Sequence, residues 1–335
     1  MTTHKVTILF EDGRGVVIDA DEANTIYLSA LKNKVRIETD CLEGACATCK
    51  GLCTQGEYYL DDHSDEALSA EEAARRQVLT CQMHPKSDCV IEFPYQSSLA
   101  LRTAPETVPG RVAEIETVAE SVVRLVVEPE AELAPFLPGQ YVHLGVPGTD
   151  QLRSYSFANP PGVTDRLSFY VKVLETGAMS DYVSGRARPG DEMAITGPFG
   201  RFYLRPPVRP IVMVAGGTGL APMLSMFDHL EETGGAGQPI RLFYGANTPG
   251  EMFGLDRVAG DGLALTTELA VVAGAAGWDG HVGHVTELLR PEHVAGGDVD
   301  AYLCGPPPMI EAAEAWLLAN GVEPARIHAE KFLPS

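Results

Sequence analysis

No apolar run in this 335-residue sequence is long enough to cross a bilayer, which takes roughly 18 or more apolar residues. The first residues, MTTHKVTILFEDG, also lack the apolar stretch and small-residue cleavage site of a secretory signal. Basic residues are scarce, with 25 Lys and Arg against 46 Asp and Glu and a net charge of −21. Nucleic-acid backbones are bound by clustered Lys and Arg, so this balance argues against a nucleic-acid partner. We expect a cytoplasmic protein that works without a membrane or a nucleic acid.

The cysteines do not form the even set that a disulfide framework needs, since there are seven of them. Cys41, Cys46 and Cys49 follow the spacing C-x4-C-x2-C, and Cys81 comes 31 intervening residues later. This spacing is typical of the ligands of a plant-type 2Fe-2S cluster. Small residues lie between the first three cysteines and allow backbone N–H groups to turn toward the sulfurs. We predict that these four thiolates bind a 2Fe-2S cluster.

Three other interpretations of the cysteines are weaker. A zinc site prefers two separate C-x2-C pairs, and only one pair is present. A Rieske centre needs two histidine ligands, and Cys81 with His84 has no upstream C-x-H to complete it. Buried thiols without a metal rarely fall on all four spacings. Cys53 and Cys89 are not needed to complete the set, so we expect packed thiols at both positions.

The first 97 residues have the pattern of a compact, β-rich module. Residues 5–20 alternate around a glycine-containing turn and predict a hairpin, and residues 24–34 predict a helix. The segment SAEEAARRQVL carries Ser69 and Glu72 at capping-box spacing and predicts a short helix that Cys81 follows directly. A closing strand, CVIEFPY, and then a linker over 98–108 are expected.

Two different patterns follow the linker. Over residues 109–206, short alternating segments separated by turns predict a small antiparallel β-barrel. Over residues 207–335, apolar runs such as IVMVAGG and IRLFYGA alternate with helical segments such as LAPMLSMFDHLEETGG. This alternation predicts an α/β domain whose parallel sheet is covered on both faces.

Four short motifs in these two regions suit nucleotide cofactors. They are Arg153-Ser154-Tyr155-Ser156, Gly177-Ala178-Met179-Ser180, Gly216-Gly217-Thr218-Gly219-Leu220-Ala221-Pro222 and Cys304-Gly305-Pro306-Pro307-Pro308-Met309. The first offers a cation, an aromatic ring and hydroxyls to a flavin, and the second begins an expected helix whose N-terminus attracts phosphate. The third reads G-x-G-x-x-P and therefore departs from the Rossmann fingerprint. Each motif alone could be a simple loop, and only their joint order after the cysteine cluster is informative.

In this order the segments DCLEGACATCKGLC, RSYSFANPP, AGGTGLAPM and CGPPPM resemble the ferredoxin–NADP reductase superfamily. Within it they resemble the reductase components of ring-hydroxylating dioxygenases, in particular those of benzoate and toluate 1,2-dioxygenase. The resemblance spans nearly the whole chain. It implies a β-grasp plant-type ferredoxin domain over 1–97, an FAD-binding barrel over 109–206 and an NAD-binding domain over 207–335.

The resemblance also implies roles for single residues. FAD would be bound by Arg153, Ser154, Tyr155, Ser156, Gly177 and Ser180, with Tyr155 stacked on the isoalloxazine and Ser156 near flavin N5. The NADH phosphates would be lined by Gly216, Gly217, Thr218 and Gly219, and the nicotinamide by Cys304, Gly305 and Pro306. Ser156 and Cys304 would lie at the reacting atoms. Phe332 would cover the other flavin face, although EKFLPS ends differently from many relatives and core packing is an alternative.

By the same resemblance, electrons would pass from NADH to FAD, then to the 2Fe-2S cluster, and on to a Rieske-type terminal oxygenase. NADH is favoured over NADPH because Asn247 to Glu251, after the strand IRLFYGA, includes no basic residue to meet a 2'-phosphate. The alternative is the reductase of a soluble phenol or methane monooxygenase, which shares the domain order and cofactors. A redox-responsive binding protein is a further alternative from another class.

Overall fold

The computed structural model of the chain describes residues 2–102, 104–259, 263–274 and 276–332. The chain divides into two compact units, residues 1–104 and residues 105–335, and each is described by itself below. Among the described residues, no helix combines the length and the apolar character that a membrane span requires. The domain boundaries that the sequence sets near residues 97, 109 and 206 remain predictions.

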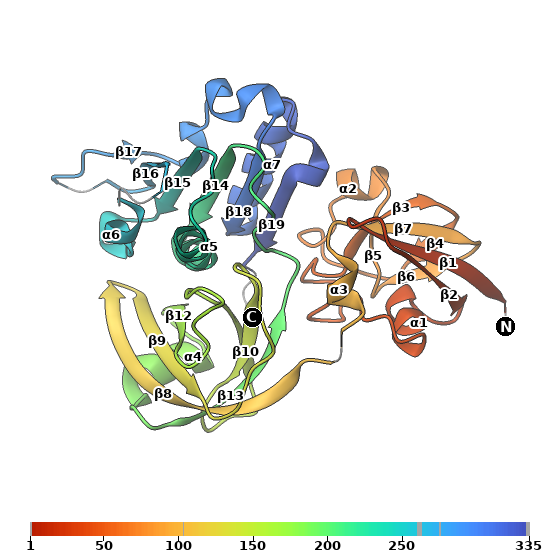
Figure 1. Ribbon diagram of the computed structural model, residues 1–335, viewed down its shortest axis with the longest axis horizontal. Helices are drawn as coiled ribbons and strands as arrows, with labels where there is room; N and C mark the ends of the chain where they lie inside the picture. The colour runs from red at the N-terminus through yellow and green to blue at the C-terminus, as the bar shows by residue number, and fades with distance from the viewer. Residues whose placement is uncertain (1, 103, 260–262, 275, 333–335) are drawn as a thin grey trace. The chain divides into compact units, whose positions relative to one another are not determined.

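The N-terminal unit is built on a five-stranded mixed sheet of order β2-β1-β7-β3-β5 (Figure 1). Its strands are β1 (Thr3–Phe10), β2 (Gly15–Asp21), β3 (Lys50–Gln55), β5 (Gln77–Leu79) and β7 (Cys89–Phe93), with a small pair β4 (Tyr58–Leu60) and β6 (Met83–Pro85) beside it. The helices are α1 (Ile26–Lys32), α2 (Ala70–Ala74) and α3 (Ser97–Ala100), the last within the predicted linker. This is the predicted ferredoxin-type α+β arrangement.

Local sequence signals explain the first elements. In β1, Val6, Ile8 and Phe10 are buried and alternate with more exposed residues, so one face of the predicted hairpin packs into the core. The side chain of Thr25 accepts a hydrogen bond from Leu28 N and caps α1. The hairpin, the first helix and the closing strand at Cys89 are therefore confirmed.

The helix predicted over SAEEAARRQVL is only partly correct. The capping box is present, because the Ser69 side chain and the Glu72 side chain each bond the other residue's backbone N–H. The helix, however, ends at Ala74, and the chain turns at Arg76 with a φ of +63°. Residues 77–79 then form β5 against β3, with buried apolar side chains. Sheet pairing and burial outweigh the local helix preference, so Cys81 follows a strand rather than a helix.

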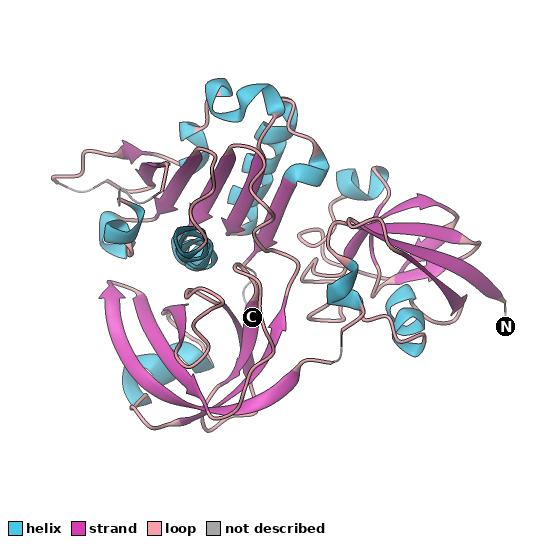
Figure 2. Cartoon of the chain, in the orientation of Figure 1, coloured by secondary structure: helices cyan, strands magenta, loops and turns pink. Residues whose placement is uncertain are grey.

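The first half of residues 105–335 is a six-stranded antiparallel half-barrel of order β11-β10-β13-β8-β9-β12 (Figure 2). Its elements are β8 (Glu106–Ala119), β9 (Val122–Pro129), β10 (Tyr141–Gly145), β11 (Leu152–Ser156), β12 (Leu167–Lys172), α4 (Ala178–Asp181), a π-helical turn (Tyr182–Arg186) and β13 (Glu192–Phe199). Buried residues such as Leu125, Leu144 and Phe169 fill its interior. The predicted antiparallel barrel is confirmed in this open form.

The second half is a six-stranded parallel sheet of order β17-β16-β15-β14-β18-β19. Its strands are β14 (Ile211–Gly216), β15 (Ile240–Ala246), β16 (Leu265–Val271), β17 (His281–Val282), β18 (Asp300–Gly305) and β19 (Ile327–Lys331). The helices are α5 (Leu220–Glu232), α6 (Leu255–Val258) and α7 (Pro307–Ala319). Short 3-10 turns cover Gly217–Gly219, Pro249–Glu251, Val285–Leu288, Pro291–Gly297 and Pro324–Arg326.

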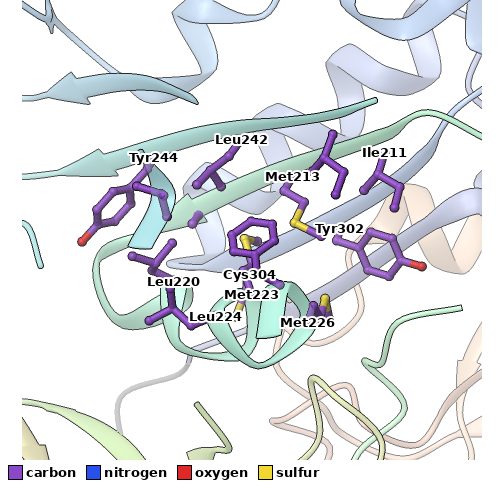
Figure 3. Packing of buried hydrophobic residues seen from close by; sticks show 14 of the residues in the cluster. Ile211, Met213, Leu220, Met223, Leu224, Met226, Leu242, Tyr244, Tyr302 and Cys304 are labelled. Atoms are coloured by element: carbon purple, nitrogen blue, oxygen red, sulfur yellow. The ribbon is translucent and has the colours of Figure 1, made fainter. Parts of the chain in front are cut away.

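Both faces of the parallel sheet are covered, as predicted. On β14, Ile211 and Met213 belong to the core shared with α5, whereas Val212 and Val214 belong to the core shared with α7. Figure 3 shows the α5 side, where methionine and leucine side chains of the helix pack on residues of the strands. Such two-sided burial is the reason for the continuous apolar run of this strand.

Direct contacts join the half-barrel to the parallel-sheet region. The Lys172 Nζ lies 2.7 Å from Glu251 Oε2 and 2.6 Å from Ser121 Oγ. The buried Ser225 hydroxyl on α5 donates to the carbonyl oxygen of Asn159 at 2.7 Å. The first contact holds the carboxyl end of β12 beside the segment that follows β15, and the second holds α5 beside the loop that follows β11.

Candidate functional site

The four predicted cluster cysteines lie in two pairs, Cys49 with Cys81 and Cys41 with Cys46. The Sγ atoms of Cys49 and Cys81 are 3.3 Å apart, and the N–H of Cys41 donates to the Cys46 Sγ at 3.4 Å. Cys49 and Cys81 are buried, and the other two are half-buried. Within the described part of the chain, no three His, Cys, Asp or Glu side chains are grouped to hold a single metal ion. A two-iron cluster instead takes two protein ligands at each iron, which suits sulfurs in pairs.

Backbone N–H groups of the loop point at the sulfurs. The N–H groups of Glu43 and Ala45 donate to Cys41 Sγ at 3.4 and 3.3 Å. Leu42 and Gly44 have positive φ angles of 61° and 73°, which turn the chain so that these groups face inward. At Gly44 a Cβ would lie 2.9 Å from side-chain atoms of two neighbouring residues, so glycine is required there. The loop therefore fits a group that carries negative charge on sulfur.

One of the buried pair is already prone to lose its proton. The hydrogen bond with Cys49 lowers the pKa of Cys81 to about 6, with a further contribution from Gln82, whose Nε2 lies 3.6 Å from the sulfur. The same hydrogen bond raises the pKa of Cys49. Because metal ligation requires thiolates, the low pKa of Cys81 favours binding of a positively charged iron centre.

The motif on β11 presents its side chains on two faces of the half-barrel. Ser154 and Ser156 lie opposite His143 and Tyr141 of β10, and Ser154 Oγ is 3.1 Å from His143 Nδ1. By strand alternation Tyr155 lies on the other face, where it packs on the barrel core and burial raises its pKa.

Arg153 shares the face of Tyr155. It donates hydrogen bonds to the carbonyl oxygen of Leu152 and to Gln151 Oε1, at 2.8 and 2.7 Å. The four residues of the motif therefore cannot all meet one flat face of a ligand. Any shared ligand must be met by two different sets of side chains.

The second motif begins a short helical segment, α4. Gly177 precedes it with a φ of +148°. The hydroxyl of Ser180 is buried and accepts a hydrogen bond from Leu174 N at 3.0 Å. Ser180 thus closes its own loop, and its predicted contact with a pyrophosphate remains a prediction.

The glycines after β14 lie where the carboxyl ends of β14 and β18 meet. A Cβ on Gly219 would lie 2.6 Å from the carbonyl carbon of Cys304, and one on Gly216 would lie 2.8 Å from Pro306 Cδ. Gly217 has a φ of +53° and faces open space, with no atom within 4 Å of a Cβ position. Ligands of open α/β sheets bind at the carboxyl ends of the strands, so this loop can receive a phosphate through its backbone.

A second set of contacts links the two catalytic candidates. Ser156 is paired across the sheet with Tyr141, whose ring lies 2.9 Å from the Cβ position of Gly200. Glu330 Oε1 is 3.7 Å from the same position, and Glu330 is the register partner of Cys304 in the parallel pair β18–β19. The structure therefore brings the strands of Ser156 and Cys304 to one place, through Tyr141 and Glu330.

Two C-terminal candidates are largely packed. Cys304 is 0% exposed and lies in the apolar core beside α5 (Figure 3), and burial raises its pKa well above the ordinary value. Phe332 packs partly against the same core, and its N–H donates to the carbonyl oxygen of Gly305 at 2.9 Å. Their contacts with a cofactor remain predictions.

Known proteins match the chain along almost its whole length. Residues 9–86 match the 2Fe-2S iron-sulfur cluster binding domain, residues 109–203 the oxidoreductase FAD-binding domain and residues 213–315 the oxidoreductase NAD-binding domain. A 2-halobenzoate 1,2-dioxygenase electron transfer component from Burkholderia cepacia is 39% identical, with 99% of this chain and 98% of the relative covered. The chain belongs to the electron-transfer components of the ferredoxin–NADP reductase superfamily.

Other relatives of this electron-transfer component agree with that assignment. The toluate 1,2-dioxygenase component from Pseudomonas putida is 38% identical, with 99% of both chains covered. A propane 2-monooxygenase reductase from Mycolicibacterium goodii is 34% identical, with 95% of this chain and 94% of the relative covered. The crystal structure of an Amycolatopsis cytochrome P450 reductase has a TM-score of 0.70 at 29% identity, with 99% of each chain covered. As a member of this family, the chain is an NAD-dependent oxidoreductase with 2Fe-2S and FAD-binding domains.

Glu330 is a further candidate in this electron-transfer component, and the sequence motifs do not single it out. It lies on the strand IHAEK, where it pairs with Cys304 and lies near Gly200. The signal was available, since the segment lies one helix after AYLCG and therefore extends the parallel sheet at that side.

Proposed function

We propose that this chain takes hydride from NADH and delivers the electrons singly to the terminal oxygenase of an aromatic ring-hydroxylating dioxygenase of the benzoate type. The observation on which the proposal depends is the pairing of four cysteine sulfurs in the same chain as a half-barrel and a nucleotide-type parallel sheet. The identity to dioxygenase components, which exceeds that to the monooxygenase reductase, supports the choice of partner.

In this scheme the chain's own residues hold and orient the cofactors and do not exchange protons with them. When bound, FAD joins a two-electron donor to a one-electron cluster, because it can exchange electrons in either number. The backbone of Gly217 and Thr218 would bind the phosphates of NADH, and Ser156 with Tyr141 would border the flavin. Stacking the nicotinamide on the flavin fixes the distance over which hydride moves, so no side chain needs to act as a general acid or base.

The preference for NADH rests on the segment after β15. Glu251 in this segment already pairs with Lys172 and accepts a hydrogen bond from Asn247 Nδ2 at 3.1 Å. A carboxylate repels a 2'-phosphate, and a neutral amide offers it no positive charge. Both groups can accept a hydrogen bond from a ribose hydroxyl. We propose that this segment meets the adenosine ribose.

Replacing one cluster ligand tests the proposed electron path. In Cys46→Ser we expect NADH-dependent reduction of ferricyanide to stay within about twofold of the wild type, while reduction of cytochrome c is lost. Cys53→Ser is the matched control, because Cys53 is not among the proposed ligands, and it should keep both activities. Loss of both activities in a folded, FAD-containing Cys46→Ser protein, or retention of both, would contradict the scheme.

Two purified oxygenases distinguish the partner. We expect the chain to support product formation by a benzoate-type dioxygenase, with NADH consumed in step with the hydroxylated product. A phenol-type monooxygenase supplies the alternative partner in a parallel reaction. Turnover with the monooxygenase alone would replace the proposed partner by the alternative without affecting the electron path within the chain.

A further inference from the structure

Two cysteines outside the cluster ligands face each other across neighbouring strands. Cys53 on β3 is opposite Ile91 on β7, and Cys89 lies two residues before Ile91, so both cysteine side chains share the buried face. The register shifts between Cys53 and Gln55, which is paired with Val90, so a β-bulge or irregularity lies between the two cysteines. Their thiols are close enough to share a hydrogen bond.

A strained arginine is directed at this thiol pair. Arg76 has a φ of +63°, a left-handed conformation that is unfavourable for a non-glycine residue. Its Nε donates to the Cys53 carbonyl oxygen at 2.7 Å and its Nη2 to the Gly56 carbonyl oxygen at 2.5 Å. The same Nη2 lies 3.6 Å from Cys53 Sγ, and the guanidinium covers the Tyr58 ring. A fixed cation beside a thiol stabilises its thiolate.

The electrostatics agree with this geometry. The hydrogen bond from Cys89, followed by that from Arg76, lowers the pKa of Cys53 to about 7, while the same pairing raises the pKa of Cys89. One thiol is therefore prepared to act as a nucleophile and the other to keep its proton. This division of roles is typical of an attacking and a resolving cysteine.

We propose that Cys53 and Cys89 are a modification site, a dithiol that hydrogen peroxide oxidises to a disulfide while the four cluster ligands stay in place. The Cys53 thiolate attacks one peroxide oxygen, the O–O bond breaks, and the leaving hydroxide takes a proton to become water. The Cys89 thiolate, formed as its proton leaves, attacks the resulting sulfenic acid, and the S–O bond breaks to release a second water. Two thiols and one peroxide thus give one disulfide and two waters.

The cover over the pair is thin. The Cys53 sulfur lies 3.2 Å from the Gln55 carbonyl oxygen, and the Cys89 sulfur lies 3.3 and 3.6 Å from the carbonyl oxygens of Ser87 and Glu57. Cys53 and Cys89 are buried, whereas Gln55 and Glu57, whose carbonyl oxygens they approach, are exposed. Forming the S–S bond of about 2.05 Å needs the two sulfurs to approach each other by side-chain rotation within one strand pair.

Peptide mapping of the iron-loaded protein tests the proposal. After treatment with hydrogen peroxide and blocking of free thiols, we expect a cross-linked peptide pair containing Cys53 and Cys89, two hydrogens lighter than the reduced pair. Iron content should be unchanged, and dithiothreitol should reverse the link. Cys89→Ser should instead yield a dimedone adduct at Cys53, and Arg76→Gln should form the disulfide roughly fivefold more slowly.

Two results would overturn the proposal, and neither depends on a variant that must fold. The first is that Cys53 and Cys89 both remain blockable thiols in iron-loaded wild-type protein after an equal concentration of free cysteine has been oxidised in the same tube. The second is that a disulfide forms only after iron is lost and includes one of the cluster ligands.

Discussion

Substituting Gly219 by alanine tests whether the loop after β14 is as tightly built as the structure indicates. Gly219 has an ordinary φ of −61°, so the effect of an added methyl group is purely steric. That methyl would lie 2.6 Å from the carbonyl carbon of Cys304 and 3.1 Å from Gly305 N. The Cys304 carbonyl oxygen would be nearer still, so restoring ordinary contacts asks the two backbones to separate by about 1 Å or more.

The consequence should appear in stability and in the use of NADH. Overpacking of this kind costs about 1–3 kcal/mol of folding free energy, and a misplacement approaching 1 Å lowers a rate by up to about 100-fold. We therefore expect kcat/KM for NADH, with ferricyanide as acceptor, to fall by one to two orders of magnitude in Gly219→Ala. FAD and iron contents should stay at wild-type levels.

Gly185→Ala is the control, because Gly185 is exposed and has no atom within 4 Å of its Cβ position. It should match the wild type in thermal midpoint and kinetics. A Gly219→Ala protein with wild-type kcat/KM would refute the idea that the approach of β14 to β18 shapes the NADH site.

Three other substitutions give separate tests. Burial beside Arg205 lowers the pKa of His328 to about 3, so folding stability should decline as pH falls below 6.5, by about 2 kcal/mol at pH 5, and denaturant midpoints of His328→Asn should lack this slope. Asn247→Arg should raise the NADPH to NADH ratio of kcat/KM about tenfold through a charge-assisted hydrogen bond, and an unchanged ratio would place the ribose elsewhere. Glu72→Gln should cost several kcal/mol of stability in thermal denaturation, because it breaks the nearly buried ion pair with Lys50.

Patterns that act within a few residues could be predicted from the sequence. The ligand spacing from Cys41 to Cys49 fixes a loop in which small residues let N–H groups face sulfur, and the structure has those N–H groups in place. The alternation of β1 and the continuous apolar run of β14 likewise report how many faces of each strand are buried. These features needed no knowledge of distant contacts.

Features set by distant contacts were beyond such reasoning. The segment before Cys81 has strong helix formers, yet its last residues form a strand that pairs with β3. Cys53 and Cys89 are packed thiols, as expected, but no sequence rule places the guanidinium of Arg76 beside Cys53. The hydrogen bond from Leu174 N to the Ser180 hydroxyl was likewise not foreseen, and the assignment of Ser180 to a pyrophosphate remains a prediction.

The pair of Lys50 and Glu72 connects the capping box of α2 to the cluster loop. Lys50 directly follows the predicted ligand Cys49, and its Nζ lies 2.6 Å from Glu72 Oε1, with both side chains nearly buried. Glu72 Oε2 also accepts a hydrogen bond from Ser69 N at 2.9 Å. Removing one charge from a buried ion pair weakens the compensation of the other charge, and breaking such a pair costs about 3–5 kcal/mol.

Glu72→Gln should therefore destabilise the N-terminal unit far more than Ser69→Ala, which removes a cap worth about 1 kcal/mol. Because Lys50 is adjacent to Cys49, we expect the Gln variant also to lose iron faster than the Ala variant when an iron chelator is added. The ratio of the two loss rates is informative even if both proteins are less stable. Equal rates of iron loss would mean that the ion pair supports α2 alone and has no part in holding the cluster loop.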